Sequence, residues 1–203
     1  MWVYQKRLQY PVNIKKPDAR LAKVIMSQFG GPDGELGASQ RYLSQRYAMP
    51  LPEVAATLTD IGTEELAHME IVSTIVRQLL KGLSADQIQE QGFADYYVDH
   101  TAGIWPQAAS GEPWTATTFQ SKGDPLTDLF ENMGAEQKAR TTYDNILRLV
   151  HDPDVRDPIK FLRQREIVHF QRFGEAMAQV RRHLDSKNYY RINPAFDRQD
   201  AKS

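Results

Sequence analysis

The segments ELAH at residues 65–68 and EIVH at residues 166–169 share one pattern, a glutamate followed three positions later by a histidine. On an α-helix this spacing places both side chains on one face, about one turn apart. A lone glutamate precedes each pair by thirty positions, Glu35 before residue 65 and Glu136 before residue 166. The order Glu, Glu-x-x-His, Glu, Glu-x-x-His is that of the ligands of a dinuclear metal centre inside a four-helix bundle. The sequence therefore predicts an all-α bundle with a metal site in its interior.

Both pairs lie on stripes whose members alternate steps of three and four residues, as on the buried seam of a bundle helix. On a helix expected at about 52–80, the stripe consists of Val54, Leu58, Ile61, Glu65, His68, Val72, Ile75 and Leu79. On a helix expected at about 157–184, it consists of Ile159, Leu162, Glu166, His169, Phe173, Ala176 and Val180. A charged group on a buried stripe is costly unless it is paired or coordinated. One such pair is common on surface helices, but two on apolar seams favour a metal site.

Two further helices complete the expected bundle, and a long connection separates its halves. The first helix is expected at about 18–47, with a kink or short break at Gly30–Pro32, and the third at about 125–150. A short helix at 84–91 and a long irregular segment at 93–123 join the second helix to the third.

The ends of the chain differ in character from the bundle. Residues 1–17 are expected to be extended, because Pro11 and Pro17 interrupt any helix there. We expect one domain over residues 1–203, with the bundle at about 18–185 and a polar tail at 186–203.

The composition excludes several classes of function. The 203 residues carry a net charge of −1, so no strong basic field favours nucleic acid. The absence of cysteine excludes disulfides, iron–sulfur clusters and thiolate zinc sites. No secretory signal is evident, and no apolar run approaches the roughly 20 residues that span a bilayer. These features predict an intracellular protein.

The donor atoms narrow the choice of metal and of chemistry. Carboxylate and imidazole ligands without sulfur suit manganese or iron. If three glutamates and two neutral imidazoles bind two divalent ions, oxidation of both ions is tolerable only when bound water loses protons at the same time. A fourth glutamate near the metals can accept such a proton. The site thus suits two-electron, two-proton chemistry on a small oxygen species.

Five segments of the chain resemble the manganese catalases, especially their short spore-coat type. They are MWVYQKRLQYPV at 1–12, GGPDGELGASQRYLSQRY at 30–47, LTDIGTEELAHMEIV at 58–72, GDPLTDLFENMGAEQKAR at 123–140 and DPDVRDPIKFLRQREIVHFQRF at 152–173. The resemblance covers about residues 1–184. It implies a ferritin-like bundle, two manganese ions without haem, and the conversion of two hydrogen peroxide molecules to water and dioxygen.

The resemblance also implies a role for each site residue. Glu35, Glu65 and His68 would bind one ion, Glu136 and His169 would bind the other, and Glu65 would bridge the two.

Two further residues would act beside the metals. Glu166 resembles the family's glutamate that stays close to the metals without binding them and moves protons. Tyr42 resembles the tyrosine that hydrogen-bonds near the first ligand. Arg163 and Arg165, which shortly precede Glu166, are expected on the helix exterior.

Two other functions compete with the catalase. One is an iron-binding ferritin-like oxidase, and the other is a spore-coat structural protein that keeps a residual metal site. The expected partners are hydrogen peroxide, further copies of the chain in a homo-oligomer (the family favours a hexamer) and other coat proteins. The expected location is the cytoplasm or the spore coat.

Overall fold

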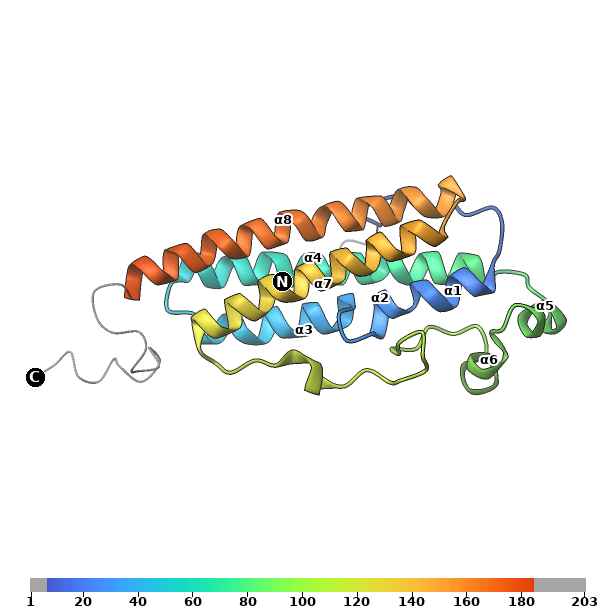
Figure 1. Ribbon diagram of the computed structural model, residues 1–203, viewed down its shortest axis with the longest axis horizontal. Helices are drawn as coiled ribbons and strands as arrows, with labels where there is room; N and C mark the ends of the chain where they lie inside the picture. The colour runs from blue at the N-terminus through green and yellow to red at the C-terminus, as the bar shows by residue number, and fades with distance from the viewer. Residues whose placement is uncertain (1–6, 185–203) are drawn as a thin grey trace, which may run out of the picture.

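The computed structural model describes residues 7–184, and within them the regular elements are helices apart from one isolated bridge between Gln107 and Pro113. Four rods run side by side (Figure 1). The first rod consists of α1 (Ala19–Ile25), α2 (Ser27–Gly30) and α3 (Glu35–Gln45), and the other three are α4 (Pro52–Leu79), α7 (Pro125–Leu149) and α8 (Pro153–Leu184). This arrangement confirms the predicted all-α bundle.

The first rod is interrupted twice rather than once. The predicted break near Gly30 is present, because α2 ends there and α3 begins at Glu35, and a second interruption lies at Met26 between α1 and α2. A Cβ atom on Gly30 would lie 2.2 Å from the backbone nitrogen of Gln107. Only glycine therefore allows the connection around residue 107 to approach the first rod so closely.

The last helix begins earlier than the sequence predicted. It starts at Pro153 instead of about residue 157. The Asp152 carboxylate accepts a hydrogen bond from the backbone nitrogen of Asp154, and the Asp152 carbonyl accepts one from that of Arg156. A proline at the first helical position is favourable, and the Asp152 cap outweighs the ladder bond that Pro158 lacks.

The connection between α4 and α7 is also less irregular than predicted. It contains the expected short helix α5 (Ala85–Glu90), but also α6 (Ala94–His100) and a 3₁₀ turn at Ala116–Phe119 inside the segment predicted to be irregular. The buried side chains of Phe93 and Tyr96 give this region an apolar face that packs on the bundle. Residues 7–17 form no helix, in agreement with the prediction, but bend at residues 7, 9, 10 and 16. Residues 1–6 and the predicted tail at 186–203 lie outside the described residues.

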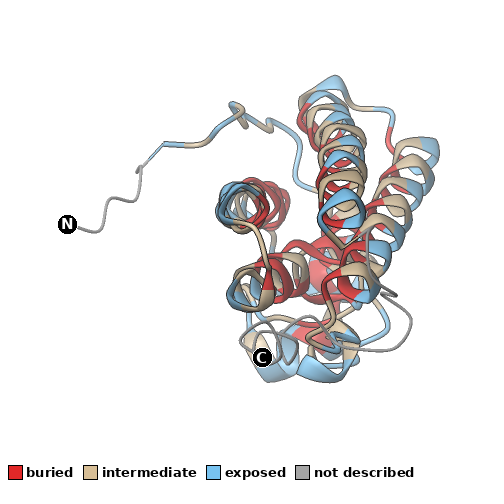
Figure 2. Cartoon of the chain, turned by 90° about the vertical axis from the view of Figure 1, so that its left-hand side faces the viewer, coloured by how far each residue is buried: buried red, intermediate tan, exposed pale blue. Residues whose placement is uncertain are grey.

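Two hydrophobic clusters fill the interior. Figure 2 shows the buried residues on the sides of the rods that face one another. On α4, Leu58 and Ile61 belong to one cluster, and Ile71 and Val72 belong to the other. Glu65 and His68 lie between them along the helix. The glutamate–histidine pairs are thus held in the middle of the bundle, away from its open ends.

Candidate metal centre

Six ionisable side chains meet in the middle of the bundle, contributed by all four rods. Helix α3 contributes its first residue, α7 contributes one glutamate, and α4 and α8 contribute one Glu-x-x-His pair each. All six have a relative exposure of 2% or less: Glu35, Glu65, His68, Glu136, Glu166 and His169. The sequence analysis named every one of them.

The Glu65 carboxylate lies between the two histidines. Its Oε2 is 2.7 Å from His68 Nδ1, and its Oε1 is 2.7 Å from His169 Nδ1. The two imidazole rings stack with their centroids 5.4 Å apart. The Glu65 carboxylate therefore presents one oxygen to each histidine.

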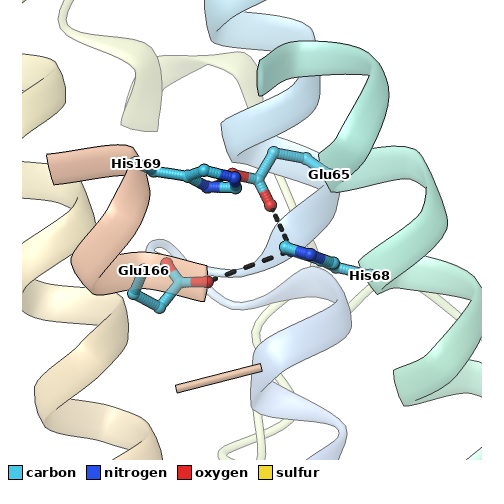
Figure 3. A group of neighbouring side chains, drawn as sticks. All are labelled: Glu65, His68, Glu166 and His169. Atoms are coloured by element: carbon cyan, nitrogen blue, oxygen red, sulfur yellow. Dashed lines mark hydrogen bonds and ion pairs between the residues drawn. The ribbon is translucent and has the colours of Figure 1, made fainter. Parts of the chain in front are cut away.

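The other glutamates surround this pair of rings. Glu35 Oε2 lies 3.8 Å from His68 Nδ1, and Glu136 Oε2 lies 3.6 Å from His169 Nδ1. Glu166 Oε1 lies 4.0 Å from His68 Nδ1. Figure 3 shows the two α4 residues and the two α8 residues pointing toward one another, and one ligand atom from each lies within 4.8 Å of the others.

Several buried atoms of the cluster have no hydrogen-bond partner. They are Glu65 Oε1, His68 Nε2, Glu136 Oε2, Glu166 Oε1 and His169 Nδ1. Glu65 Oε1 and His169 Nδ1 lie 2.7 Å apart, but not in the geometry of a hydrogen bond. Buried polar atoms nearly always have hydrogen-bond partners, so a group of unpaired oxygen and nitrogen atoms in one place is unusual. Carboxylate oxygens and an imidazole nitrogen are suitable ligands for a hard or intermediate divalent cation. The residues therefore fit a metal ion.

The electrostatics of the metal-free cluster agree with this fit. Burial, and next the negative charge of Glu65, raise the pKa of Glu35 from 4.5 to about 8. Burial and the charges of Glu35 and Glu136 likewise raise the pKa of Glu166 well above its usual value. The carboxylates cannot all ionise together without a compensating cation, so protons take the place that metal ions would occupy.

The pKa shifts of the two histidines and of Glu65 favour the charged forms of these groups, whereas those of Glu35 and Glu166 favour the neutral form. Burial opposes the charged forms of the histidines, but the negative charge of Glu65 and the hydrogen bonds to surrounding carboxylates together outweigh burial and raise the pKa of His68 and of His169. Burial would raise the pKa of Glu65, yet the charges of His169 and His68 hold it well below its usual value. Metal-free, the three groups form one buried ionic unit.

Two tyrosines support the outer glutamates in a reciprocal arrangement. Tyr42 donates to Glu136 Oε1 at 2.5 Å, and Tyr143 donates to Glu35 Oε1. Tyr42 was predicted to lie near Glu35, two turns away along α3, but its hydroxyl reaches across to Glu136 of α7. Tyr143 was not predicted as a site residue. It follows Glu136 by seven positions, as Tyr42 follows Glu35.

One more carboxylate was missed by the sequence analysis. Glu64 lies behind both histidines, 3.0 Å from His169 Nε2 and 3.6 Å from His68 Nε2. Arg165, expected on the helix exterior, is half-buried and pairs with Glu64 at 2.7 Å. The signal was the adjacent pair Glu64–Glu65, in which only the second residue shares the apolar seam.

The fold and the cluster together define the class of protein: a four-helix bundle with a carboxylate–imidazole cluster, suited to metal ions, between its helices. A family profile, described as manganese containing catalase, matches residues 1–187. The chain belongs to this family, which confirms the predicted resemblance. Family membership implies manganese as the metal of the cluster.

Individual relatives agree with this assignment. Protein CotJC of Bacillus subtilis strain 168 is 47% identical over 190 residues, covering 94% of this chain and 100% of the relative. The probable manganese catalase of Clostridium acetobutylicum is 34% identical over 194 residues, covering 93% of this chain and 85% of the relative. The crystal structure of KatB, a manganese catalase from Anabaena, matches with a TM-score of 0.83 at 29% identity, covering 92% of this chain and 84% of KatB. The match confirms the ferritin-like fold.

Proposed function

We propose that this protein is a manganese catalase, which converts two hydrogen peroxide molecules to two water molecules and one dioxygen molecule. The observation that carries the proposal is the Glu65 carboxylate, buried and 2.7 Å from one nitrogen of each histidine. This arrangement, in a member of the manganese catalase family, supports a site for two ions rather than one. Two manganese ions would supply the electron chemistry by cycling between the divalent and trivalent pairs.

Two groups of side chains would bind the two ions, one group for each ion. Glu35 and His68 lie on one side of Glu65, and Glu136 and His169 lie on the other. We therefore assign Glu35, Glu65 and His68 to one ion and Glu136 and His169 to the second, with Glu65 shared. The two hydrophobic clusters above and below exclude bulk water from the six side chains.

Glu166 and Tyr42 have roles beside the ions in this proposal. Peroxide disproportionation requires protons to leave one peroxide and reach another. Glu166 would hold and return such protons at Oε1, which is buried and has no hydrogen-bond partner. Tyr42 would fix the Glu136 carboxylate through its 2.5 Å hydrogen bond.

The proposal is tested by elemental analysis of the native protein together with oxygen evolution from peroxide. We expect about two manganese ions per chain and rapid oxygen release. Glu65→Ala, or His68→Ala, should lose metal and oxygen release together, while Glu70→Ala, an exposed position on the same helix, should keep both. Iron in place of manganese, with ferroxidase activity and slow peroxide turnover, would instead indicate the ferritin-like oxidase.

A structural role in the spore coat is the second candidate. The observation in its favour is the resemblance to the short spore-coat type of the family, together with 47% identity over the full length of Protein CotJC. The two roles are compatible, because a coat protein can carry an active centre. Weak turnover of the fully metallated protein, with normal assembly into a homo-oligomer such as a hexamer, would favour the coat role. Location in the cytoplasm or the coat is then settled by fractionating spores.

Within residues 7–184, no helix combines the length and apolar character needed to cross a membrane.

A further inference from the structure

Each histidine of the cluster presents its two ring nitrogens to two different carboxylates. Both Nδ1 atoms face Glu65, at 2.7 Å, on the inner side. Both Nε2 atoms face Glu64 on the outer side, at 3.0 Å for His169 and 3.6 Å for His68. An imidazole that gives its Nδ1 lone pair to a metal carries its proton on Nε2. Glu64 is therefore hydrogen-bonded to His169 Nε2 and also faces His68 Nε2, which has no hydrogen-bond partner of its own.

Glu64 is itself held from two other segments. Arg165 of α8 contacts it with two nitrogens, Nε at 2.7 Å from Oε1 and Nη2 at 3.1 Å from Oε2. Gln9, from the extended N-terminal segment, donates to Oε1 at 2.7 Å. Such a two-point guanidinium contact fixes the plane of a carboxylate as well as its charge.

The N-terminal segment is anchored independently of Glu64. Gln78 of α4 donates to the carbonyl of Val12 at 3.0 Å and accepts from the backbone nitrogen of Ile14 at 2.6 Å. The ring of Tyr10 stacks on that of Phe161 with centroids 4.9 Å apart. Gln9 is therefore held against α4 and α8 by its own neighbours and reaches Glu64 from a fixed position.

We propose that Glu64 is a positioning residue that sets the tautomer and orientation of both histidines at once, and that Arg165 and Gln9 hold it in place. The inference rests on the proposed dimanganese centre. Because one carboxylate serves both rings, its loss acts on the two halves of the centre together. A residue that served one histidine would weaken only one ion.

An alternative explanation is that the Glu64–Arg165 pair merely ties α4 to α8. A pair with that role affects unfolding but leaves metal affinity and the spectrum of the bound metal unchanged. Metal binding and spectroscopy therefore separate the two explanations, and neither measurement depends on catalytic turnover.

The experiment uses Glu64→Gln, which keeps the shape of the side chain and removes its charge. Manganese affinity is measured by competition with a chelator, and the divalent pair is examined by electron paramagnetic resonance. We expect an affinity lower by about 10- to 100-fold, both ions lost in parallel, and an altered spectrum. Glu70→Gln, which removes the same charge from an exposed position on α4, should match the parent in every measurement.

A second pair of variants makes the test independent of how well Glu64→Gln folds. Arg165→Lys keeps the positive charge but loses the two-point contact, and should lower manganese affinity by a smaller factor. Arg163→Lys is its control, because Arg163 pairs with Asp144 at 2.6 Å and does not contact the cluster. Gln9→Ala should change the spectrum in the same direction as Arg165→Lys.

The outcomes separate this inference from the proposed function. If the parent binds two manganese ions while Glu64→Gln and Arg165→Lys keep its affinity and spectrum, the role of Glu64 is wrong and the proposed function stands. If the parent itself binds no manganese, the proposed function fails and the inference fails with it.

Discussion

Glu166 differs from the other glutamates of the cluster in its contacts. Glu65 contacts both histidines, and Glu35 and Glu136 each accept a hydrogen bond from a tyrosine. Glu166 forms no side-chain hydrogen bond within the described residues, and its Oε1 lies 4.0 Å from the nearest imidazole nitrogen. A carboxyl group that is buried, close to the metals and not fully engaged is well placed to exchange protons with a substrate.

Replacement of Glu166 by glutamine should therefore separate metal binding from catalysis. Glu166→Gln keeps the volume of the side chain but cannot take up and release a proton. We expect manganese content near that of the parent and oxygen evolution slower by about 100-fold or more. Glu175→Gln, at an exposed position on α8, is the matched control. A Glu166→Gln protein as fast as the parent would remove the proton role.

Tyr143 offers a test of the support behind the outer ligands. Its ring is fully buried and its hydroxyl donates to Glu35 Oε1. Tyr143→Phe leaves that oxygen without this donor, so the free energy of unfolding of the metal-free protein should fall by about 1–3 kcal/mol. Urea denaturation measures the change. Tyr97→Phe, at a side chain that is 39% exposed, should change it little, and equal effects of the two variants would refute the argument.

At the level of single residues, the sequence predicted the glutamates and histidines of the cluster, but not the residues that hydrogen-bond to them. Glu65 and Glu166 stood out because a charge on an apolar stripe needs an explanation. Glu64 and Tyr143 did not stand out, since a glutamate beside the stripe and a tyrosine on it are both ordinary. Their roles depend on which helix lies opposite, and helical periodicity carries no information about that.

Among the elements, the first rod is in close contact, at its break near Gly30, with the connection between α4 and α7. The backbone at Pro106 and Gln107 passes so near Gly30 that any side chain there would overlap with it. The break also places Glu35 at the first position of α3, where its carboxylate faces the cluster.

Gly30→Ala should accordingly destabilise the protein, by about 1–3 kcal/mol, because the connection must move to admit the methyl group. Gly134→Ala is the control, since Gly134 lies on the exposed face of α7 with nothing within 4 Å of its added Cβ. There the free energy of unfolding should rise by about 0.5–1 kcal/mol. Thermal and urea unfolding report both changes, and a Gly30→Ala protein as stable as the parent would show that the contact is unimportant.

The boundaries of the elements show where sequence patterns lose their power. The ends of α4 and α7 were predicted closely, because Pro52 and Pro125 lie at first-turn positions and apolar stripes run through both helices. The start of α8 was predicted about four residues late, because Asp152 caps a helix that already begins at Pro153. Helix α6 was missed because its seven residues are too few to show a clear period.

For the whole molecule, the central cluster links all four rods, so its protonation should control the stability of the metal-free protein. The pKa of Glu35 is raised from 4.5 to about 8, and that of Glu166 is also raised. The metal-free folded protein therefore holds more protons than the unfolded chain between about pH 5 and 8. Raised pKa values of His68 and His169 extend the same imbalance above pH 6.5.

The sign of the effect follows directly. Where the folded state binds more protons, the free energy of unfolding falls as the pH rises, by up to about 1.4 kcal/mol per pH unit for each extra proton. Glu64 and Glu65 have lowered pKa values, so they contribute stability above pH 4.5 that is lost only under more acidic conditions. The metal-free protein should thus be most stable near pH 5 and less stable at pH 8.

Manganese should reverse this trend, because the ions displace the protons and bind more tightly as the pH rises. Urea denaturation between pH 5 and 8 tests both arms, with a chelator in one series and excess manganese in the other. The difference between the two series should widen toward pH 8. Glu35→Gln should flatten part of the metal-free slope, while Glu175→Gln should leave it unchanged. A metal-free protein whose stability stays level or increases over this range would show that the four rods are not held together through a protonated cluster.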